Sequence, residues 1–205
     1  MLSRRSILAL LAGLALPAYA QDSFKDVERI VAIGDIHGDY DQLVSVLRAA
    51  EVIDKSNRWV GGKTFLVQTG DLLDRGADAK KVMDLLIDLE PQAKKAGGRV
   101  LSLLGNHETM NLYGDLRYVI PEDFETFITG KMKPSPGHPS GWADRKKAFE
   151  TDGQYGKWMR QKNAIVKIND IVFLHGGISP KYEKTSISTI NNEVREELSN
   201  FDKLQ

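Results

Sequence analysis

Short apolar runs alternate with amphipathic segments through the first half of the chain. The apolar runs cover residues 29–33, 64–69 and 99–104, and each has the length of a buried strand. Between them, apolar residues recur three and four positions apart over 43–50 and 82–89, which is the spacing of one helix face. Strands that alternate with helices in this way predict right-handed βαβ units and a parallel sheet.

Local signals indicate where the two helices begin and end. Asp39, with Gln42 three residues later, is typical of a capped helix start. Pro91 is expected to end the second helix, because its ring and its missing N–H do not fit a helix interior. The charged pair Lys94-Lys95 that follows is interpreted as a solvated surface.

The pattern is less regular between residues 111 and 162. Three prolines and two glycines predict a loop over residues 132–141. Residues 142–160 are predicted to be helical, with a break near Gly153 and Gly156. We expect this part of the chain to form a helical insertion that covers one side of the functional site.

The last part of the chain predicts a hairpin and a terminal helix. Apolar residues at 164–167 and 171–174 flank an Asn-Asp pair, which is the pattern of two strands joined by a tight turn. A final amphipathic helix is predicted from four apolar residues at helical spacing: Ile190, Val194, Leu198 and Phe201. The predicted fold class is therefore α/β, a layered sheet with flanking helices and a helical insertion.

The composition is that of an ordinary folded domain. The 205 residues are 41% hydrophobic and 27% charged, which predicts one domain with a sizeable core. The 28 basic and 28 acidic residues cancel, so no general attraction for nucleic acid is expected. Cysteine is absent, which excludes thiolate metal ligands and a cysteine nucleophile.

Residues 1–20 have the pattern of a secretory signal peptide. Arg4 and Arg5 precede an apolar stretch at residues 7–16, and Ala18-Tyr19-Ala20 provides a small-x-small cleavage site. The stretch is shorter than the roughly 20 residues needed to span a bilayer, so no stable membrane insertion is expected after cleavage. The two arginines leave Sec and twin-arginine export both open. We expect an exported protein, periplasmic or secreted, with a mature domain over residues 21–205.

The predicted strands end in loops that place polar side chains beside glycines. Gly34-Asp-Ile-His-Gly38, Gly70-Asp-Leu-Leu-Asp-Arg-Gly76 and Gly105-Asn-His-Glu108 follow the first three strands, and His175-Gly-Gly177 follows the hairpin. Taken singly, a Gly-Asp pair is usually a turn with an Asx hydrogen bond. Together, the loops of parallel strands are expected to meet at one sheet edge, where open α/β sheets bind their ligands.

Five side chains in these loops predict a metal centre: Asp35, His37, Asp71, Asn106 and His175. Carboxylate, imidazole and amide oxygen ligands suit manganese, iron or zinc. Two metal ions about 3.5–4 Å apart need a shared ligand and can clamp the oxygens of a phosphoryl group. Asp71 is the candidate bridge, with Asp35 and His37 completing one metal ion and Asn106 and His175 serving the other. A hydroxide bridging the two ions is the expected nucleophile.

The four loops resemble, in order, the motifs of the calcineurin-like metallophosphoesterases, in the version used by serine/threonine phosphoprotein phosphatases. Residues 110–117, Gly156-Lys-Trp-Met-Arg160 and His175-Gly-Gly-Ile-Ser-Pro180 resemble the Shewanella-like phosphatase branch more particularly. The resemblance extends from Ile30 to about Leu198. It implies metal-dependent hydrolysis of phosphomonoesters, with phosphorylated proteins, including those on tyrosine, as the first-choice substrates and small phosphoesters as the simpler ones.

The resemblance also implies roles for particular residues. His107 matches the residue that protonates the leaving alcohol, and Asp74 matches its carboxylate partner. Arg75 matches the guanidinium that grips phosphate oxygens, and Asn106 is expected to assist in phosphate binding. Two divalent metal ions are implied, with manganese as the first choice and iron or zinc as the alternatives.

The chain departs from the family pattern after the His-Gly-Gly loop. A further metal-binding histidine in a later strand, and usually another phosphate-binding arginine, belong to that pattern. The remaining histidine, His138, lies in a Pro-Gly-His-Pro loop and is interpreted as a solvated surface side chain. We therefore expect a C-terminally incomplete domain that lacks the last strands of the family fold. Two alternatives stay open: a dinucleoside polyphosphate hydrolase, and an inactive remnant that binds metal or phosphate.

Overall fold

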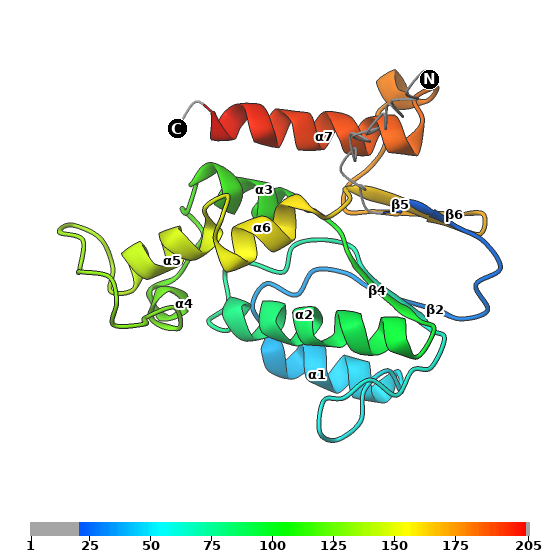
Figure 1. The fold of residues 1–205 in the computed structure, drawn as a ribbon, viewed down its shortest axis with the longest axis horizontal. Helices are drawn as coiled ribbons and strands as arrows, with labels where there is room; N and C mark the ends of the chain where they lie inside the picture. Colours follow the sequence, from blue (N-terminus) through cyan, green and yellow to red (C-terminus); the bar gives the residue numbers. More distant parts are fainter. Residues whose placement is uncertain (1–20, 204–205) are drawn as a thin grey trace, which may run out of the picture.

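The computed structural model describes residues 21–203, so the predicted signal peptide lies outside the described residues. Three parallel strands form the first sheet in the order β2 (Ile30–Ile33), β3 (Phe65–Gln68) and β4 (Arg99–Ser102). Helices α1 (Tyr40–Ala49) and α2 (Ala79–Lys95) connect them and lie together on one side of the sheet (Figure 1). The predicted alternation of strands and helices is confirmed, and the carboxyl ends of all three strands lie at one edge.

The sequence predicted the start of α1 correctly and the end of α2 incorrectly. The Asp39 side chain accepts a hydrogen bond from the Gln42 backbone N–H (3.0 Å), which confirms the predicted cap. The prediction that Pro91 ends α2 is wrong, because the helix runs through it to Lys95. Proline removes one helical hydrogen bond, but tertiary contacts hold the last turn. Ala93 is fully buried, and Gln92 accepts a hydrogen bond from the Trp59 backbone N–H (2.9 Å).

The second sheet contains the predicted hairpin and one strand that was not predicted. Strands β5 (Ile165–Ile168) and β6 (Ile171–Leu174) pair antiparallel, as expected. The two-residue strand β1 (Ser23–Phe24) pairs parallel with β5, which gives the order β1-β5-β6. A strand this short has no periodicity for a sequence pattern to detect. Asn169 in the hairpin turn helps to hold it, because its side chain exchanges hydrogen bonds with the Val27 backbone (2.9 and 3.1 Å).

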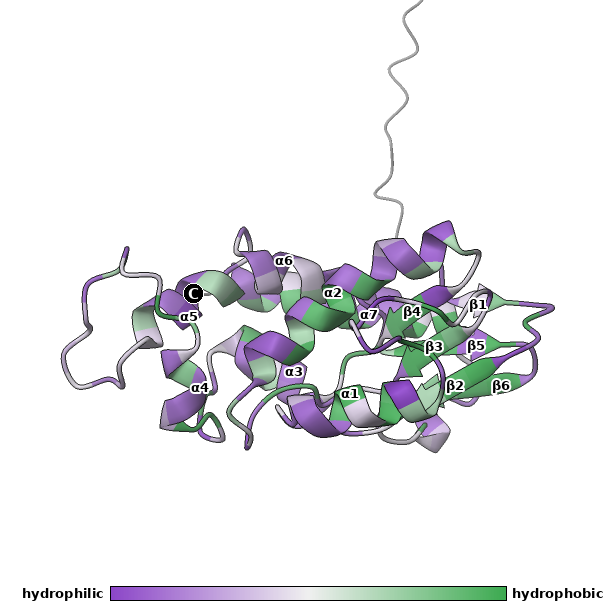
Figure 2. Cartoon of the chain, turned by 90° about the horizontal axis from the view of Figure 1, so that it is seen from below, coloured by the Kyte–Doolittle hydropathy of each residue, from purple (hydrophilic) through white to green (hydrophobic). Residues whose placement is uncertain are grey.

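The two sheets lie in adjacent layers between α1 and α2 on one side and α7 (Ile187–Asp202) on the other (Figure 1). Figure 2 shows that the most hydrophobic segments gather in the strands. A small apolar cluster fills the space between the sheets, with Val67 and Leu103 from one side meeting Val166 and Ile168 from the other. The larger cluster joins α1 and α2 to the first sheet.

Helix α7 confirms the predicted amphipathic helix at the end of the chain. Asn191, buried on its inner face, accepts hydrogen bonds from the backbone N–H groups of Ala164 (2.9 Å) and Ile165 (3.1 Å). Its side-chain amide also donates to the Ile165 carbonyl (2.9 Å). These bonds tie α7 to the start of β5, and Leu198 packs into the main core. No helix in residues 21–203 is long and apolar enough to cross a membrane.

The insertion consists of short helices, α3 (Asn106–Tyr113), α4 (Pro121–Glu125), α5 (Trp142–Phe149) and α6 (Gln154–Arg160). The chain is irregular over residues 132–141, as predicted, and the helical segment breaks at Gly153. Gly156, by contrast, lies inside α6. A side chain at Gly156 would overlap the carbonyl groups of Phe149 and Glu150, so this glycine permits close packing and does not mark a break.

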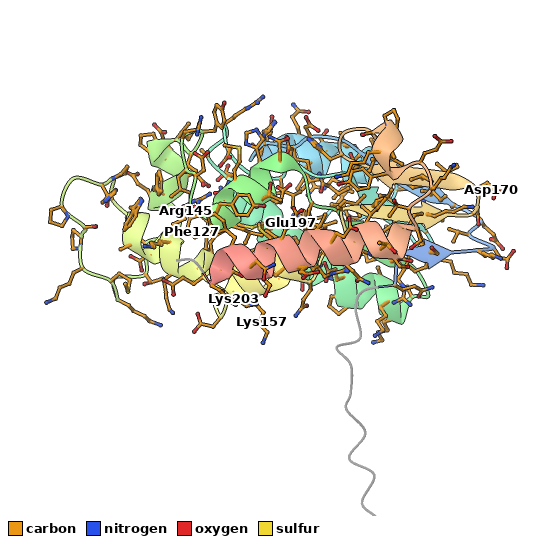
Figure 3. The ribbon with its side chains drawn as sticks, turned by 90° about the horizontal axis from the view of Figure 1, so that it is seen from above. Phe127, Arg145, Lys157, Asp170, Glu197 and Lys203 are labelled. Carbon is orange, nitrogen blue, oxygen red and sulfur yellow. The ribbon has the colours of Figure 1, made fainter. Side chains whose placement is uncertain are left out.

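A buried ion pair organises the insertion. Arg145 is 1% exposed and donates from Nε to a carboxylate oxygen of Asp123 (3.0 Å). Its guanidinium lies within 5.5 Å of the ring centroids of Phe124, Phe127 and Phe149, and Figure 3 shows it beside Phe127. Burial raises the pKa of Asp123 and lowers the pKa of Arg145, while the charge of each partner opposes both shifts.

The irregular loop over residues 132–141 contains His138, the histidine that was not assigned to the metal centre. His138 is exposed, which agrees with its interpretation as a surface side chain. Its ring stacks on Trp142 with 3.9 Å between the ring centroids. The contact keeps the loop against the start of α5.

Candidate metal centre

The loops after β2 and β3 are hydrogen-bonded to each other at the edge where the strands end. The backbone N–H groups of Ile36 and His37 both donate to the Asp71 carbonyl (2.9 and 3.0 Å), and Gly38 N–H donates to the Leu72 carbonyl (2.9 Å). Residue 105 has to be glycine here, because an added Cβ would overlap Asp71. The backbone therefore brings the predicted loops into one cluster before any side chain is considered.

Backbone strain is concentrated in the same loops. His37, Asp71, Asp74 and Arg75 all have positive φ values, between +48° and +70°. Non-glycine residues rarely adopt this left-handed conformation, and it persists only where the surroundings hold it in place. Strain of this kind clusters at functional sites.

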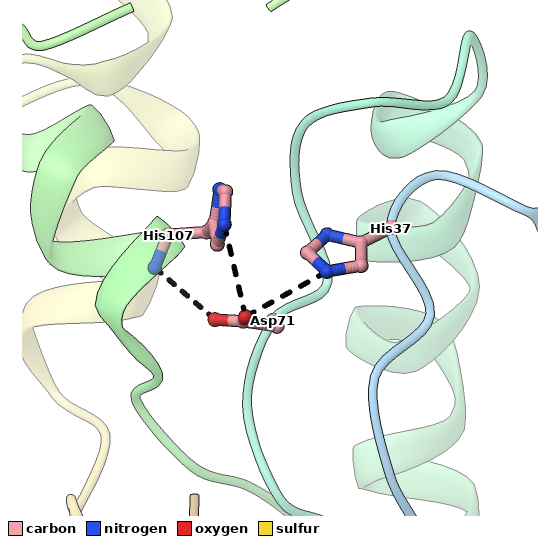
Figure 4. A group of neighbouring side chains, drawn as sticks. All are labelled: His37, Asp71 and His107. Carbon is pink, nitrogen blue, oxygen red and sulfur yellow. Dashed lines mark hydrogen bonds and ion pairs between the residues drawn. The ribbon is translucent and has the colours of Figure 1, made fainter. Parts of the chain in front are cut away.

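Asp71 lies at the centre of the cluster and is 3% exposed. Its Oδ2 atom lies 3.3 Å from His175 Nε2, 3.7 Å from His37 Nε2 and 3.9 Å from His107 Nε2. Its Oδ1 atom accepts a hydrogen bond from the His107 backbone N–H (3.1 Å), and Figure 4 shows Oδ2 between the rings of His37 and His107.

The other predicted ligands surround Asp71. Asp35 lies 3.9 Å from His37 Nε2 through Oδ2 and 3.7 Å from His175 Nδ1 through Oδ1. The amide oxygen of Asn106 lies 3.1 Å from His175 Nε2. His37 is oriented by its second nitrogen, because Nδ1 lies 2.8 Å from the Leu73 carbonyl. The five predicted ligands are thus together in space.

Distances divide the donors into two groups that share one residue. Asp35, Asp71 and His175 form one group, and His37, Asp71 and His107 form the other, with the ligand atoms of each group within 4.8 Å of one another. Asp35 also lies 3.9 Å from His37 Nε2, so these separations do not test the predicted pairing of Asp35 with His37. Asp71 belongs to both groups, which is the position of a bridging ligand.

The donor set fits divalent cations of the manganese, iron and zinc class, because it combines carboxylate oxygens with imidazole nitrogens. Most of the separations around Asp71 Oδ2 are longer than hydrogen bonds. Among residues 21–203, no hydrogen-bond partner reaches the buried Nδ1 atom of His175. A cation held by these residues would satisfy the polar groups that the protein leaves without close partners.

His107 and Asp74 form a buried pair beside the cluster. His107 Nδ1 lies 2.6 Å from Asp74 Oδ2, and both side chains are nearly inaccessible to solvent. An ionised carboxylate only accepts, so Nδ1 carries the proton and Nε2 faces Asp71. The Arg75 guanidinium lies 3.5 Å from the same Nε2 atom and is itself exposed.

Sequence reasoning gave no role to Asn111, which supports this pair. Its side-chain amide donates to Asp74 Oδ1 (3.0 Å) and to the His107 carbonyl (2.8 Å). It therefore holds the carboxylate of Asp74 from the side opposite His107. The available signal was its spacing, because a residue four positions after His107 lies on the same face of a helix.

Glu108 is the second residue whose role was missed. Its buried carboxylate accepts hydrogen bonds from the backbone N–H groups of Asp71 (2.7 Å), Gly105 (2.8 Å) and Leu72 (2.8 Å). Burial raises the pKa of Glu108, and the three amide groups oppose that rise. The signal was the capping-box spacing between Gly105 and Glu108 at the start of α3. One carboxylate thus fastens two of the site loops together.

Glu108→Gln is expected to lower the free energy of unfolding by about 1–3 kcal/mol, because the new amide group turns a donor toward a buried backbone donor. The measurement is urea unfolding of the full chain beside Glu122→Gln, an exposed glutamate in α4. Equal stabilities for the two variants contradict the role given to Glu108.

The layered fold with this donor cluster at its strand ends is that of a metallophosphoesterase. The calcineurin-like phosphoesterase family model matches residues 28–204, and the chain belongs to that family. The family uses a dinuclear divalent metal site, for which the chain has the candidate ligand groups.

Similar proteins include two phosphatases and one solved structure. Shewanella-like protein phosphatase 2 of Arabidopsis thaliana is 36% identical, over 88% of this chain and 54% of its own length. Shewanella-like protein phosphatase 1 of Plasmodium berghei is 35% identical, over 87% of this chain and 47% of its own length. The cold-active protein-tyrosine phosphatase of a psychrophilic Shewanella superposes with a TM-score of 0.75 at 35% identity, over 88% of this chain and 52% of that one.

A more distant similarity concerns the alternative substrate class. The symmetrical bis(5'-nucleosyl)-tetraphosphatase of Hamiltonella defensa is 28% identical, over 79% of this chain and 49% of its own length. The chain spans about half the length of the curated relatives it matches.

Proposed function

We propose that this protein hydrolyses phosphomonoesters with two divalent metal ions, and that its substrates are phosphorylated proteins, including those phosphorylated on tyrosine. The observation that supports this most directly is the position of Asp71. Its Oδ2 atom is common to both donor groups, and His107 Nε2 faces it from 3.9 Å. The phosphatase names of relatives at 35–36% identity support the same substrate class.

We assign some residues of the site to metal binding and others to contact with the substrate. Asp35, His37, Asp71, Asn106 and His175 would hold the metal ions, and manganese is the metal we propose. When bound, such ions polarise phosphoryl oxygens and lower the pKa of bound water. Hydrolysis adds one water oxygen to phosphorus and breaks the ester P–O bond, so the leaving oxygen needs a proton.

Three residues then act on the substrate. Arg75, exposed beside His107, binds phosphate oxygens through its guanidinium. A second proton on His107, at Nε2, is transferred to the leaving oxygen. Asp74 orients that imidazole, because its carboxylate is hydrogen-bonded to Nδ1 at 2.6 Å.

The test is hydrolysis of an aryl phosphate by purified protein that has been stripped with a chelator and reloaded with manganese. Bound metal is counted in the same sample. Turnover that disappears on stripping and returns with two metal ions per chain is the expected result. Metal binding without turnover points to the inactive remnant, and a preference for dinucleoside tetraphosphate over phosphomonoesters points to the alternative hydrolase.

We also propose that the protein is exported to the periplasm or beyond it. The support is the sequence of residues 1–20, with two arginines, an apolar stretch and a small-x-small cleavage site. Cell fractionation with N-terminal sequencing of the purified protein tests this, and the expected first residue is Gln21. A protein that keeps residues 1–20 and stays in the cytoplasm contradicts the proposal.

A further inference from the structure

An aromatic side chain to which no role has been assigned lies beside His107, the proposed proton donor. Tyr118, in the segment between α3 and α4, lies with its ring centroid 5.3 Å from that of His107. The ring is 45% exposed, although aromatic rings normally bury most of their surface. Tyr118 therefore presents part of its side chain to solvent directly beside His107, which is 2% exposed.

The position of Tyr118 is fixed relative to the phosphate-binding group. The Tyr118 carbonyl accepts a hydrogen bond from the Arg75 backbone N–H (3.0 Å), so the backbones of the two residues are linked. This bond uses the backbone alone, and the tyrosine side chain takes no part in it. Replacing the side chain therefore keeps the support that the backbone gives to Arg75.

The direction of a leaving group follows from the atoms around His107. Nδ1 is occupied by Asp74, so the leaving oxygen takes its proton from Nε2. Arg75 holds the phosphate on that same side, because its guanidinium lies 3.5 Å from Nε2. The carbon attached to the leaving oxygen would therefore lie beside the His107 ring, whose centroid is 5.3 Å from that of Tyr118.

We propose that the ring of Tyr118 is a specificity-determining surface that packs against an aromatic leaving group, so that it favours phosphotyrosine over phosphoserine. The inference rests on the function proposed above. A second ring within 4.8 Å of His107 belongs to His37, whose nitrogen faces Asp71 and is assigned to metal binding. Tyr118 is therefore the ring with a free face. A serine leaving group has no ring to pair with it and gains nothing from this contact.

The test compares the wild-type protein with Tyr118→Ala and Tyr118→Phe. Calorimetry measures binding of O-phosphotyrosine and O-phosphoserine to the manganese-loaded protein, and kcat/KM is measured with two peptides that differ only in the phosphorylated residue. Tyr118→Ala is expected to lose about 3–10-fold in affinity and kcat/KM for the tyrosine ligands, the size of one aromatic pair, with little change for the serine ligands. Tyr118→Phe keeps the ring and is expected to match the wild type.

Several outcomes overturn the proposal. An equal loss for tyrosine and serine ligands assigns Tyr118 a structural role, and no loss for either shows that the ring is not contacted. A loss in Tyr118→Phe as large as in Tyr118→Ala assigns the effect to the hydroxyl group. The binding measurement distinguishes this inference from the proposed function. If the protein shows no turnover but its binding preference for phosphotyrosine still depends on the Tyr118 ring, the hydrolase function is contradicted and the role of Tyr118 is supported.

Discussion

His107→Asn is expected to slow hydrolysis of an alkyl phosphate by about 10²–10⁴-fold while the bound metal stays unchanged. Asparagine has no group that can donate a proton at Nε2, although it can still reach Asp74 by a hydrogen bond. The loss is expected to be smaller with an aryl phosphate whose leaving group is acidic, because such a leaving group needs no proton. The measurement is kcat for both substrates, with metal content determined on each sample.

His138→Asn is the matched control, since it makes the same substitution at an exposed histidine outside the cluster. Unchanged hydrolysis in His107→Asn excludes His107 as the acid. Less bound metal in His107→Asn than in the wild type assigns His107 to metal binding instead. His107 belongs by distance to the group of His37 and Asp71, and metal loss shows that it acts there as a ligand.

Asp71→Asn is expected to remove most of the bound metal and to bring turnover down to the level of the chelator-treated protein. Asp71 Oδ2 is the atom shared by both donor groups, so neutralising it weakens both sites at once. The amide oxygen can still accept the hydrogen bond from the His107 backbone N–H, which keeps the loop in place. Metal content by elemental analysis and kcat in the same samples give the result.

Two comparisons make this experiment specific. Asp35→Asn alters one donor group alone and is expected to lose about half of the metal that Asp71→Asn loses. Asp170→Asn, in the exposed hairpin turn labelled in Figure 3, is expected to lose none. Full metal content in Asp71→Asn, or equal losses in Asp35→Asn and Asp71→Asn, contradicts the bridging role of Asp71.

Sequence patterns predicted most of the fold, because its main elements are amphipathic or wholly apolar. The parallel order of β2, β3 and β4 followed from strands that alternate with helices. Predictions failed where a tertiary contact opposed the conformational preference of a single residue. Pro91 should end a helix by its own chemistry, but tertiary contacts at Gln92 and Ala93 hold the turn that follows it.

Strand β1 and the packing role of Gly156 show the same limit. Two residues have no period, so Ser23–Phe24 becomes a strand through its pairing with β5 alone. Gly156 was predicted to break a helix, but it lies within α6 because the neighbouring carbonyl groups leave no room for a side chain. The pairing of β1 depends on β5, which is far away in the sequence. The crowding at Gly156 depends on how the chain turns between the end of α5 and α6, which brings the carbonyl groups of Phe149 and Glu150 against it.

The sequence by itself determined which loops meet, because parallel strands joined by helices bring their carboxyl ends to one edge. Asp35, His37, Asp71 and Asn106 were therefore recognisable from the sequence. His175 follows the antiparallel hairpin, and it was singled out by the resemblance of its His-Gly-Gly loop to the family motif. Tertiary structure alone decided the distances between these atoms, with Asp71 Oδ2 lying 3.3–3.9 Å from nitrogens of His37, His107 and His175.

The supporting residues also depended on the tertiary structure. Glu108 fastens the loops that contain Asp71 and Gly105, Asn111 holds Asp74, and Tyr118 places a ring over His107. The physical reason is distance along the chain. The contacts of Glu108 with Asp71 and of Asn111 with Asp74 each join residues 37 positions apart, a separation that a local pattern does not register. The contact of Glu108 with Gly105 spans three positions and does follow a local pattern.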